Sequence, residues 1–313
     1  MGDLVSIIIP TYIGYDMLPR AIDSALRQTY ENIEILVVDD NDPDSEPRRL
    51  TAELMKNYSD SRIRYIRRPK NSGIAAAKNT GIENASGVYL AFLDDDDYYL
   101  KDRIEKCVRY MEKHESYIGV YTGVDILDRQ NNVTHRLRPK SNMSVNKMLM
   151  NHMALGTGSN TFIRREYAEK IGRHDESFIR RTDNEFTVRL CKCGTIGYIN
   201  ECLVVKGINS TDNIPSYETM KGVLDHFFEV FAEDINKLGY RKTEFYRRQY
   251  HTLMRVAIRD KNRNEIKEAY RLIRRYGRVN LKTRIRMWIF LHNLTHVEML
   301  YIWIVSTFKP RRF

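Results

Sequence analysis

Short apolar runs alternate with segments of helical spacing through the first part of the chain. Apolar runs rich in β-branched residues, typical of strands buried on both faces, occupy residues 4–10, 33–38, 63–66, 88–93 and 117–124. Between them, apolar side chains recur at the spacing of amphipathic helices, over residues 16–30, 48–58, 74–85 and 101–114. This alternation predicts an α/β fold with a parallel, doubly wound sheet. Sites in such sheets lie at the carboxyl ends of the strands, where polar residues cluster in this sequence.

The pattern changes in the second part of the chain. Residues 125–144 are polar and rich in loop-forming residues. From residue 216 to about residue 280, apolar positions recur at helical spacing. We therefore expect an α/β domain over residues 1–215 and a basic helical region over residues 216–313.

The charge is unevenly divided between these two regions. The 313 residues carry 51 Lys and Arg against 41 Asp and Glu, a formal net charge of +10, and 42% of them are hydrophobic. This apolar content excludes an intrinsically disordered chain. Residues 236–313 contain 20 basic and 5 acidic side chains, so the first 235 residues are net acidic. A basic total suggests nucleic acid or an anionic membrane surface as a partner, and here that suggestion concerns the C-terminal region alone.

The N-terminal apolar run is too short for a signal peptide and has no basic segment before it. We therefore expect a cytoplasmic protein, in which the four cysteines are free thiols.

Four consecutive aspartates, residues 94–97, follow the apolar run at residues 88–93. Adjacent carboxylates raise one another's pKa values unless a cation neutralises them. Oxygen ligands of this kind suit Mg²⁺ or Mn²⁺, which prefer one or two carboxylates together with substrate phosphates. We therefore favour a metal ion that carries a nucleotide diphosphate over a solvated acidic loop that caps the next helix. The sequence has neither G-x-x-x-x-G-K-[ST] nor a G-x-G-x-x-G after a strand, which argues against a P-loop NTPase and a dinucleotide dehydrogenase.

Several ordered motifs accompany these aspartates. They are SIIIPTY at 6–12, S-x-x-x-QTY at 24–30, VVDDN at 37–41, N-x-G-x-A-x-x-KN-x-G at 71–81, FLDDDD at 92–97, and TD-x-EF-x-x-RL with a following glycine at 182–194. Each motif alone is modest, but the ordered set, over about residues 4–210, resembles the family 2 glycosyltransferases. The resemblance implies the GT-A fold, with a mostly parallel, Rossmann-like central sheet, and an inverting glycosyltransferase of bacterial polysaccharide synthesis.

The resemblance implies a binding site for a nucleotide-sugar donor, which we expect to be UDP-linked. Pro10, Thr11 and Tyr12 would line the base pocket, with Tyr12 stacking on the nucleobase. Asp40 would accept a hydrogen bond from the base, because a pyrimidine N–H needs an acceptor and an ionised carboxylate only accepts. Since successive side chains of a strand point to opposite faces, Asp39 would be structural.

Further donor contacts follow from the other motifs. The donor-loop residues would be Asn71, Gly73 and Lys78. Lys78 stands where the family often has Arg and would lie near the diphosphate; the alternative is a solvated helix charge. Asp94 and Asp95 would reach ribose and sugar hydroxyls, and Asp96 would bind the Mn²⁺ or Mg²⁺ ion.

The resemblance places the general base at Asp183. Inverting transfer needs the acceptor hydroxyl deprotonated as it attacks the anomeric carbon, and a positioned carboxylate can accept that proton while a metal ion stabilises the departing diphosphate. Glu185 is a weaker candidate, because a carboxylate in the first turn of a helix is favoured there on electrostatic grounds alone. Asp175 and Glu176 are weaker alternatives still.

The sequence departs from the family pattern at several positions. Thr182 stands where the family often has Glu, and Ile13 where it usually has Asn. Many relatives have a histidine near the metal ion where this chain has Lys206, Asn209 and Ser210. Lys206 could contact the diphosphate in its place.

The C-terminal segment 287–308 is largely apolar and aromatic, with basic residues on both sides. A spanning helix needs about 20 predominantly apolar residues, and His292, Asn293, His296 and Glu298 make spanning expensive. Tryptophan and tyrosine beside basic flanks suit a helix in the membrane interface, so we expect peripheral attachment to the anionic inner face of the cell membrane. The alternative is a helix packed on the catalytic domain or on a second subunit of a homo-oligomer.

Three hypotheses for the function remain. The leading one is a metal-dependent, inverting transferase that moves a sugar from a nucleotide donor to a hydroxyl of a glycan or lipid-linked acceptor. A nucleic-acid-binding protein is disfavoured, because the sequence has no RNP, KH or zinc-finger pattern and the aromatic residues of the C-terminal segment lie in apolar runs. A sugar nucleotidyltransferase would also use paired aspartates, but it would have a glycine-rich, basic loop after the first strand, which residues 11–16 lack.

Overall fold

The computed structural model describes residues 2–128, 130–151, 154–207 and 215–279, together with residues 281, 284–285 and 287–288. The chain divides into two compact units, Met1–Asp212 and Asn213–Phe313.

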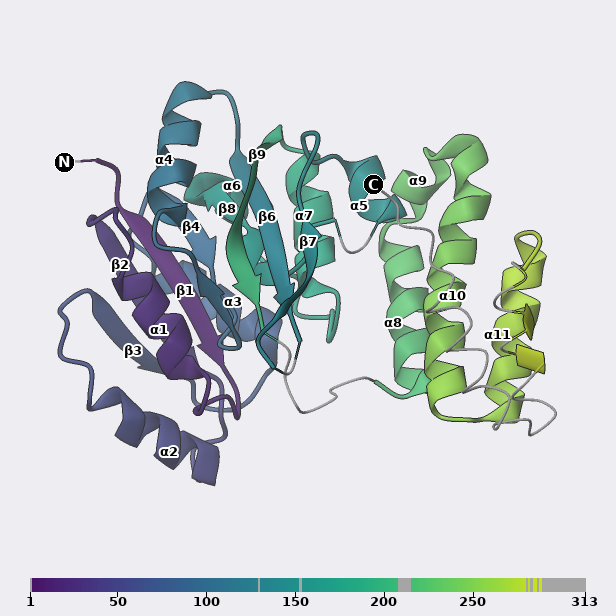
Figure 1. Cartoon of the computed structure of the whole chain (residues 1–313), viewed down its shortest axis with the longest axis horizontal. Coiled ribbons are helices and arrows are strands. Elements are labelled where there is room, and N and C mark those ends of the chain that lie inside the picture. Colours follow the sequence, from purple (N-terminus) through teal and green to yellow (C-terminus); the bar gives the residue numbers. More distant parts are fainter. Residues whose placement is uncertain are drawn as a thin grey trace. The chain divides into compact units, whose positions relative to one another are not determined.

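The first unit is built on a sheet that has nine strands within the described residues (Figure 1). The strand order is β3-β2-β1-β4-β8-β6-β9-β5, and β7 pairs with β6 outside this path. The parallel part consists of β3 (Ile63–Arg67), β2 (Ile33–Asp39), β1 (Val5–Thr11) and β4 (Tyr89–Phe92). Every residue of β1 and β4 is buried, as in parallel strands covered on both faces. The α/β class predicted from the alternating pattern is therefore confirmed.

Antiparallel pairs complete the other half of the sheet. β8 (Phe162–Arg164) runs antiparallel to β4 and to β6 (Gly119–Leu127), whereas β9 (Ile196–Lys206) runs parallel to β6. β5 (Asp97–Tyr99) pairs antiparallel with β9, and β7 (Val133–Leu137) with β6.

The prediction of a loop over residues 125–144 is wrong at β7. Most of this strand is exposed, and within the described residues it pairs with one neighbour. An exposed edge strand needs no apolar face, so its hydropathy pattern resembles that of a loop.

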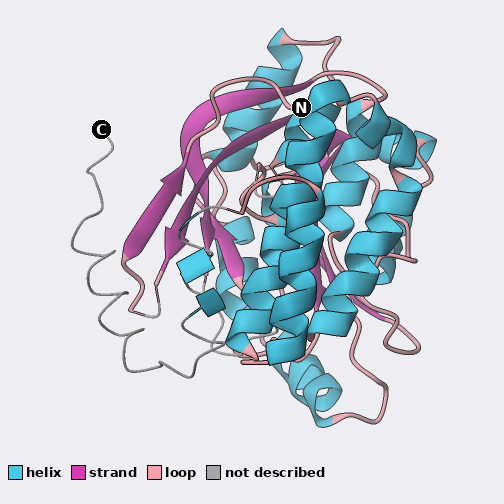
Figure 2. Cartoon of the chain, turned by 90° about the vertical axis from the view of Figure 1, so that its right-hand side faces the viewer, coloured by secondary structure: helices cyan, strands magenta, loops and turns pink. Residues whose placement is uncertain are grey.

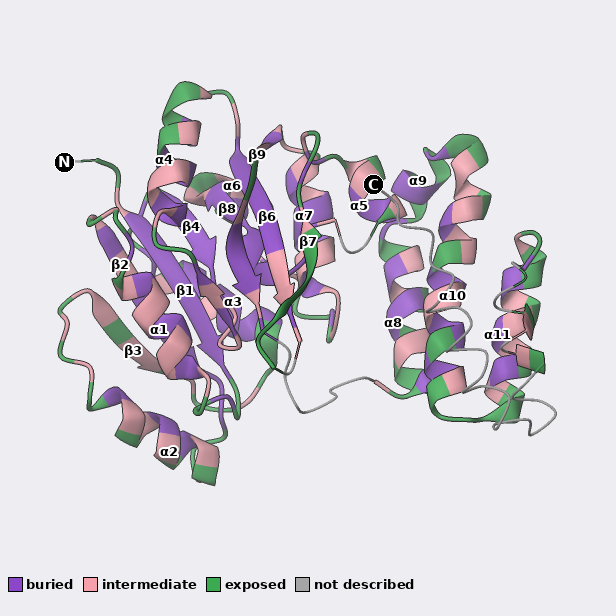
Figure 3. Cartoon of the chain, in the orientation of Figure 1, coloured by how far each residue is buried: buried purple, intermediate pink, exposed green. Residues whose placement is uncertain are grey.

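Helices pack on both sides of the parallel strands. Ile7 and Ile9 of β1 share a core with buried residues of α1 (Leu18–Leu26) and α4 (Arg103–Lys113). α3 (Ile74–Asn84) packs on β1 and β2, where a Cβ atom on Gly81 would lie 2.3 Å from the Ile8 side chain. Figure 3 shows these central strands as the buried layer. The remaining helices of this unit are α2 (Glu46–Met55), α5 (Val145–Met150), the 3₁₀ helix η1 (Gly158–Asn160), α6 (Arg165–Lys170) and α7 (Thr182–Cys191).

The second unit is helical over its described residues, which Figure 2 shows in cyan. Its elements are α8 (Tyr217–Val230), α9 (Ala232–Asn236), the 3₁₀ helix η2 (Gly239–Arg241), α10 (Lys242–Arg259) and α11 (Arg263–Arg275). α8, α10 and α11 share an apolar core that contains Leu224, Leu253 and Ile273. No helix within the described residues is both long and apolar enough to cross a bilayer. The interfacial helix expected at residues 287–308 lies almost entirely outside the described residues.

Candidate active site

Three neighbouring parallel strands end at one edge of the sheet, and polar residues follow each of them. β1 ends at Thr11, β2 at Asp39 and β4 at Phe92, just before the four aspartates. Thr11 is the register partner of Asp39, and β1 also pairs with β4. The segments after these strands therefore lie side by side, as expected for a site at the carboxyl ends of parallel strands.

Three of the four consecutive aspartates converge. One carboxylate oxygen from each of Asp94, Asp96 and Asp97 lies within 4.8 Å of the others. Burial, followed by repulsion from neighbouring aspartates, raises the pKa of Asp96 to about 6 and the pKa of Asp97 to about 7. A divalent cation would relieve this repulsion, and three carboxylate oxygens at this spacing fit Mg²⁺ or Mn²⁺. Asp94 and Asp97 thus join Asp96 as candidate ligands.

Asp97, for which the sequence indicates no role of its own, is buried at the start of β5. Its carboxylate accepts hydrogen bonds from the Thr157 and Ser159 hydroxyls at 2.5 and 2.6 Å, and from the Gly207 backbone N–H at 3.2 Å. These bonds attach the segment around η1 to the four aspartates at residues 94–97, called the acidic group below. In the sequence these hydrogen bonds are indicated only weakly, by one hydroxyl residue on each side of Gly158.

Asp95 is directed toward the end of β1 instead. It accepts a 2.6 Å hydrogen bond from the Thr11 hydroxyl, and burial raises the pKa of Asp95 to about 6. A Cβ atom on Gly14 would lie only 2.1 Å from the carboxylate of Asp95, so the chain after β1 needs a glycine there. At the same edge, Pro10 is buried, whereas the Tyr12 side chain is 51% exposed and so accessible to a planar ligand.

The two aspartates at the end of β2 differ in their partners. Asp39 is fully buried, pairs with Arg48 at 3.2 Å and accepts hydrogen bonds from the backbone and side-chain amides of Asn41. Asp40 pairs with Arg68 at 2.5 Å. Burial raises the pKa of Asp40, and the Arg68 guanidinium offsets part of this rise. Asp39 therefore supports the strand end.

The loop at residues 71–73 donates backbone hydrogen bonds to the carboxylate of Asp40. The Gly73 backbone N–H donates to Asp40 at 2.8 Å and to the Asn71 side chain at 3.0 Å. Gly73 has a φ of 90°, which glycine adopts without strain. Asn71 and Gly73 thus shape the loop that surrounds Asp40.

Lys78 joins two parts of the site. Its side chain is fully buried, and its ammonium lies 2.7 Å from a carboxylate oxygen of Asp183 and 3.2 Å from one of Asp94. Burial alone would lower the pKa of Lys78, but the two carboxylates outweigh it and raise the pKa. Burial likewise opposes ionisation of Asp183, yet Lys78 lowers the pKa of this aspartate overall. Lys78 therefore holds Asp183 ionised beside the metal-ligand candidates.

Asp183 lies in the first turn of α7 and packs closely against η1. A Cβ atom on Gly158 would lie 2.4 Å from a carboxylate oxygen of Asp183, so a larger residue there would displace this carboxylate. The side chain of Asp183 remains 32% exposed, which leaves it open to a substrate.

The other carboxylates near α7 are engaged in the structure. Glu185 is fully buried and pairs with Arg189 at 2.6 Å, while it also accepts the Asp175 backbone N–H at 3.0 Å. Glu176 accepts a hydrogen bond from Asn79 at 2.9 Å. The Asp175 carboxylate accepts hydrogen bonds from the Ser177 backbone N–H and hydroxyl at 2.9 and 2.6 Å. All three alternatives to Asp183 are therefore held by other groups.

Lys206 is the β-register partner of Asp97, at the end of β9. It counters part of the rise in the pKa values of Asp96 and Asp97 that burial produces. A cation therefore lies beside the aspartates at this strand end. Asn209 and Ser210, named with Lys206 in the sequence, lie outside the described residues.

Comparison with known proteins identifies the family. A family model described as "Glycosyl transferase family 2" matches residues 6–172, more than half of the chain. The chain belongs to glycosyl transferase family 2. The match runs from β1 through α6 and includes all four aspartates of the acidic group. This is the family that the resemblance in the sequence indicated.

Curated relatives agree with this family. An uncharacterized glycosyltransferase of Rickettsia typhi is 28% identical over 91% of this chain and 96% of its own length. The glucosyltransferase WfaP of Escherichia coli, named for a UDP-Glc donor and a diphosphoundecaprenol-linked acceptor, is 38% identical over 40% of this chain and 49% of its own length. Other relatives are much longer than this glycosyltransferase, which spans about a third of the length of one from Rickettsia felis.

Solved structures support the fold. The crystal structure of TarS 1–349 from S. aureus in complex with UDP-GlcNAc covers 94% of this chain, with a TM-score of 0.55 at 14% sequence identity. The chain covers 80% of that structure. The predicted GT-A fold with a C-terminal helical region is confirmed by this likeness.

Proposed function

We propose that this glycosyltransferase transfers a sugar, with inversion, from a UDP-linked donor to a hydroxyl of a glycan or lipid-linked acceptor in cell-surface polysaccharide synthesis. The observation that carries the proposal is the close association of Asp183, Lys78 and Asp94 at the carboxyl ends of the strands. It places a candidate base next to candidate ligands of the donor diphosphate. A UDP-sugar also fits the printed names of the WfaP relative and the TarS complex.

Recognition of the donor is assigned to the ends of β1 and β2. Tyr12 would stack on the uracil, in a pocket lined by Pro10 and Thr11. Asp40 would accept the base N–H with an acceptor position that Arg68, Gly73 and the Ser72 backbone N–H leave open, since a carboxylate has about four acceptor positions. Asn71 and Gly73 would hold that carboxylate in place.

The acidic group is assigned to the diphosphate. Asp94, Asp96 and Asp97 would hold a Mg²⁺ or Mn²⁺ ion, which when bound supplies positive charge to the leaving diphosphate. Asp95, held by Thr11, would accept hydrogen bonds from the ribose or sugar hydroxyls.

The proton of the acceptor hydroxyl is assigned to Asp183. An ionised carboxylate accepts this proton as the hydroxyl oxygen bonds to the anomeric carbon and the bond to the donor phosphate breaks. Lys78 keeps Asp183 ionised near neutral pH, and the 32% exposure of the Asp183 side chain leaves room for the acceptor.

The proposal is tested in two steps. First, thermal unfolding is measured with UDP, GDP, dTDP and CDP, each with Mn²⁺ and with EDTA. We expect stabilisation that is largest for UDP with Mn²⁺; no response to any of the four contradicts a nucleotide-sugar donor.

Second, Asp183→Asn is compared with the wild-type protein and with the control Asp225→Asn, an exposed aspartate on α8. Asp183→Asn should abolish UDP release from the donor while it leaves the UDP response unchanged. Retained UDP release in this variant would show that another group is the base.

We also propose that the basic helical region attaches this enzyme to the anionic inner face of the cell membrane. A cavity of about 520 Å³ is lined by three basic residues of α11, Lys267, Arg271 and Arg274, together with Tyr270 and Met287. Its described lining contains no carboxylate. Each basic residue near an anionic surface contributes about 1 kcal/mol of binding. We expect the full chain to float with anionic but not neutral vesicles, and Arg271→Gln with Arg274→Gln to weaken this binding. Equal flotation with anionic and neutral vesicles, together with dimers in solution, would favour a homo-oligomer instead.

A further inference from the structure

Two arginines, one from α1 and one from α4, donate to the backbone around the acidic group. The Arg20 guanidinium donates a 2.6 Å hydrogen bond to the backbone carbonyl of Asp96. The Arg103 guanidinium donates to the backbone carbonyl of Ser159 at 3.0 Å. One carbonyl belongs to the acidic group itself and the other to η1. Both arginines therefore hold main-chain segments that carry or contact the aspartates.

The two tyrosines of β5 lie against these arginines. Successive side chains of a strand point to opposite faces, so Tyr98 and Tyr99 lie on opposite sides of β5. The Arg20 guanidinium lies 4.9 Å from the centre of the Tyr98 ring, and the Arg103 guanidinium lies 4.4 Å from the centre of the Tyr99 ring. A guanidinium within about 6 Å of a ring centre is attracted to the ring face. An arginine therefore packs on each side of the strand that begins at Asp97.

Arg103 carries a buried charge. Its side chain is fully buried, and its Nε has no hydrogen-bond partner within the described part of the chain. The guanidinium also donates to the sulfur of Cys107 at 3.3 Å, and no carboxylate of the described residues forms an ion pair with it. Burial of a charge without a counter-charge is costly, and an apolar side chain would avoid that cost. We therefore expect the contacts of the Arg103 guanidinium to offset it.

Ser159 connects Arg103 to two candidate metal ligands. The Ser159 hydroxyl donates to the Asp97 carboxylate at 2.6 Å and accepts the Asp94 backbone N–H at 2.9 Å. The Ser159 carbonyl accepts the Tyr99 hydroxyl at 3.2 Å as well as the Arg103 guanidinium. Arg103 and Tyr99 thus hold the backbone of the residue that orients Asp97 and contacts Asp94.

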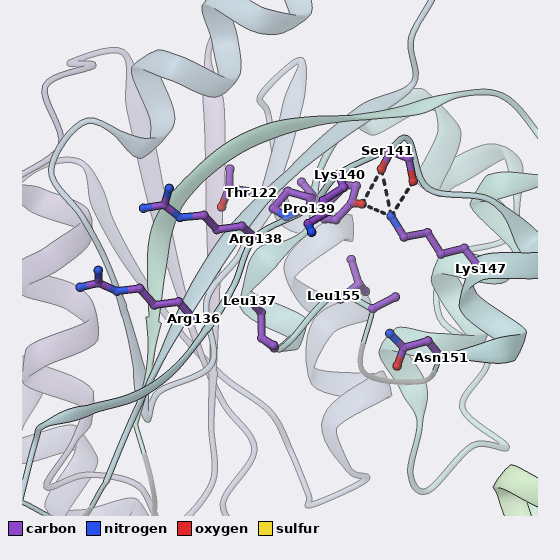
Figure 4. A pocket seen from close by; sticks show the side chains of 12 residues that line it. Thr122, Arg136, Leu137, Arg138, Pro139, Lys140, Ser141, Lys147, Asn151 and Leu155 are labelled. Atoms are coloured by element: carbon purple, nitrogen blue, oxygen red, sulfur yellow. Dashed lines mark hydrogen bonds between the residues drawn. The ribbon is translucent and has the colours of Figure 1, made fainter. Parts of the chain in front are cut away.

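The arginines beside β7 have a different environment. They line a cavity of about 340 Å³ that Leu155 also lines (Figure 4). Figure 4 shows the guanidinium groups of Arg136 and Arg138 extending away from Leu155, whose carbonyl accepts a 2.7 Å hydrogen bond from Asn160 of η1. Arg136 pairs with Asp125 at 3.3 Å instead. The direction of Arg20 and Arg103 toward the acidic group is therefore not a general property of arginines in this unit.

We propose that Arg20 and Arg103 are positioning residues of the acidic group, an inference that rests on the metal-dependent transfer proposed above. They act through the Asp96 carbonyl and through Ser159. In this way they hold the three converging carboxylates at a spacing that fits a divalent cation. Groups that bond to the ligands of a metal, rather than to the metal, change its affinity about 10–100-fold when they are removed.

The test is binding of Mn²⁺ to the full chain in the presence of UDP. It is measured from the EPR signal of free Mn²⁺, with UDP without protein as the blank. Each arginine is replaced by an unbranched apolar side chain, in Arg20→Met and Arg103→Met, and we expect each variant to bind Mn²⁺ about tenfold more weakly. Loss of a nearby positive charge alone would strengthen the binding of a cation. The direction of the change therefore separates positioning from simple electrostatics.

Control variants on the same helices keep the test specific. Arg27→Met and Arg109→Met remove exposed arginines at the end of α1 and on α4, and both should bind Mn²⁺ like the wild type. Arg103→Lys returns a donor for the Ser159 carbonyl and should recover most of the lost affinity. Arg20 is only partly buried, so Arg20→Met keeps the test valid if Arg103→Met does not fold.

The outcomes distinguish this inference from the proposed function. Wild-type or tighter Mn²⁺ binding in either methionine variant overturns the role of that arginine, and equally weak binding in the control variants overturns both roles. In each of these cases, Mn²⁺ binding by the wild type leaves the proposed transfer function standing. If the wild type binds no Mn²⁺ beyond the UDP blank, the metal-dependent mechanism and this inference are both wrong.

Discussion

The role of Lys78 leads to a prediction about pH dependence. Lys78→Met removes a buried ammonium that lies 2.7 Å from Asp183 and 3.2 Å from Asp94. An opposite charge at such a distance lowers a carboxylate pKa by about 1–3. The variant should therefore raise the pKa of Asp183. If Asp183 is the base, as proposed, transfer is lost as the pH falls through this pKa, so the acidic limb of the kcat/KM profile should move to higher pH.

The same substitution should destabilise the fold. Loss of one partner from a buried pair costs about 3–5 kcal/mol, whereas an exposed pair is worth less than about 1 kcal/mol. The side chains of Asp183 and Asp94 are 32% and 26% exposed, so this pair is neither fully buried nor fully exposed and its energy should lie between the two values. We expect a loss of about 2–3 kcal/mol in the free energy of unfolding.

The assay is UDP release by donor hydrolysis, with water in place of the acceptor, from pH 4.5 to 8 at saturating Mn²⁺. Lys78→Arg restores a cation and should return the acidic limb to its wild-type position. Folded Lys78→Met protein with an unshifted limb would refute the reasoning, because the charge of Lys78 would then not control Asp183.

Three further variants and conditions test other contacts of the site. Gly158→Ala places a Cβ atom 2.4 Å from the carboxylate of Asp183 and should displace that carboxylate. Because a displacement near 1 Å can reduce turnover about 100-fold, we expect UDP release to slow by about this factor. A wild-type rate of UDP release would contradict this packing. Glu185→Gln leaves the Arg189 charge without its partner and should destabilise the fold by about 3–5 kcal/mol in denaturant titrations, whereas a change under about 1 kcal/mol would mean that the pair is dispensable. The raised pKa of Asp97, about 7, means that the folded state binds a proton that the unfolded state has lost, so between about pH 4 and 7 the stability from this group falls as the pH rises. The Mn²⁺-induced increase in unfolding temperature should therefore grow from pH 5 to 7.5 and shrink in Asp97→Asn, and a pH-independent increase would contradict this.

The parallel half of the sheet follows from the sequence, because continuous apolar strands and intervening helices leave a clear hydropathy pattern. The strand β5 could not be predicted, because it begins within the aspartate run. The strand β7 could not be predicted either, because it is an exposed edge strand. Similar limits apply to the site. The sequence placed Lys78 near the diphosphate, whereas its contact with Asp183 joins residues 105 positions apart, which no local pattern encodes.

The short helix η1 also restricts how this enzyme could acquire a new specificity. Ser159 and Thr157 hold Asp97, Gly158 accommodates Asp183, and Asn160 accepts a hydrogen bond from Thr122 of β6. A mutation that reshapes this turn would disturb the candidate metal ligands and the candidate base together. Exchange of loops between related transferases should therefore succeed when the graft ends before residue 157 and fail when it crosses the turn, which makes these four residues a natural boundary for engineering.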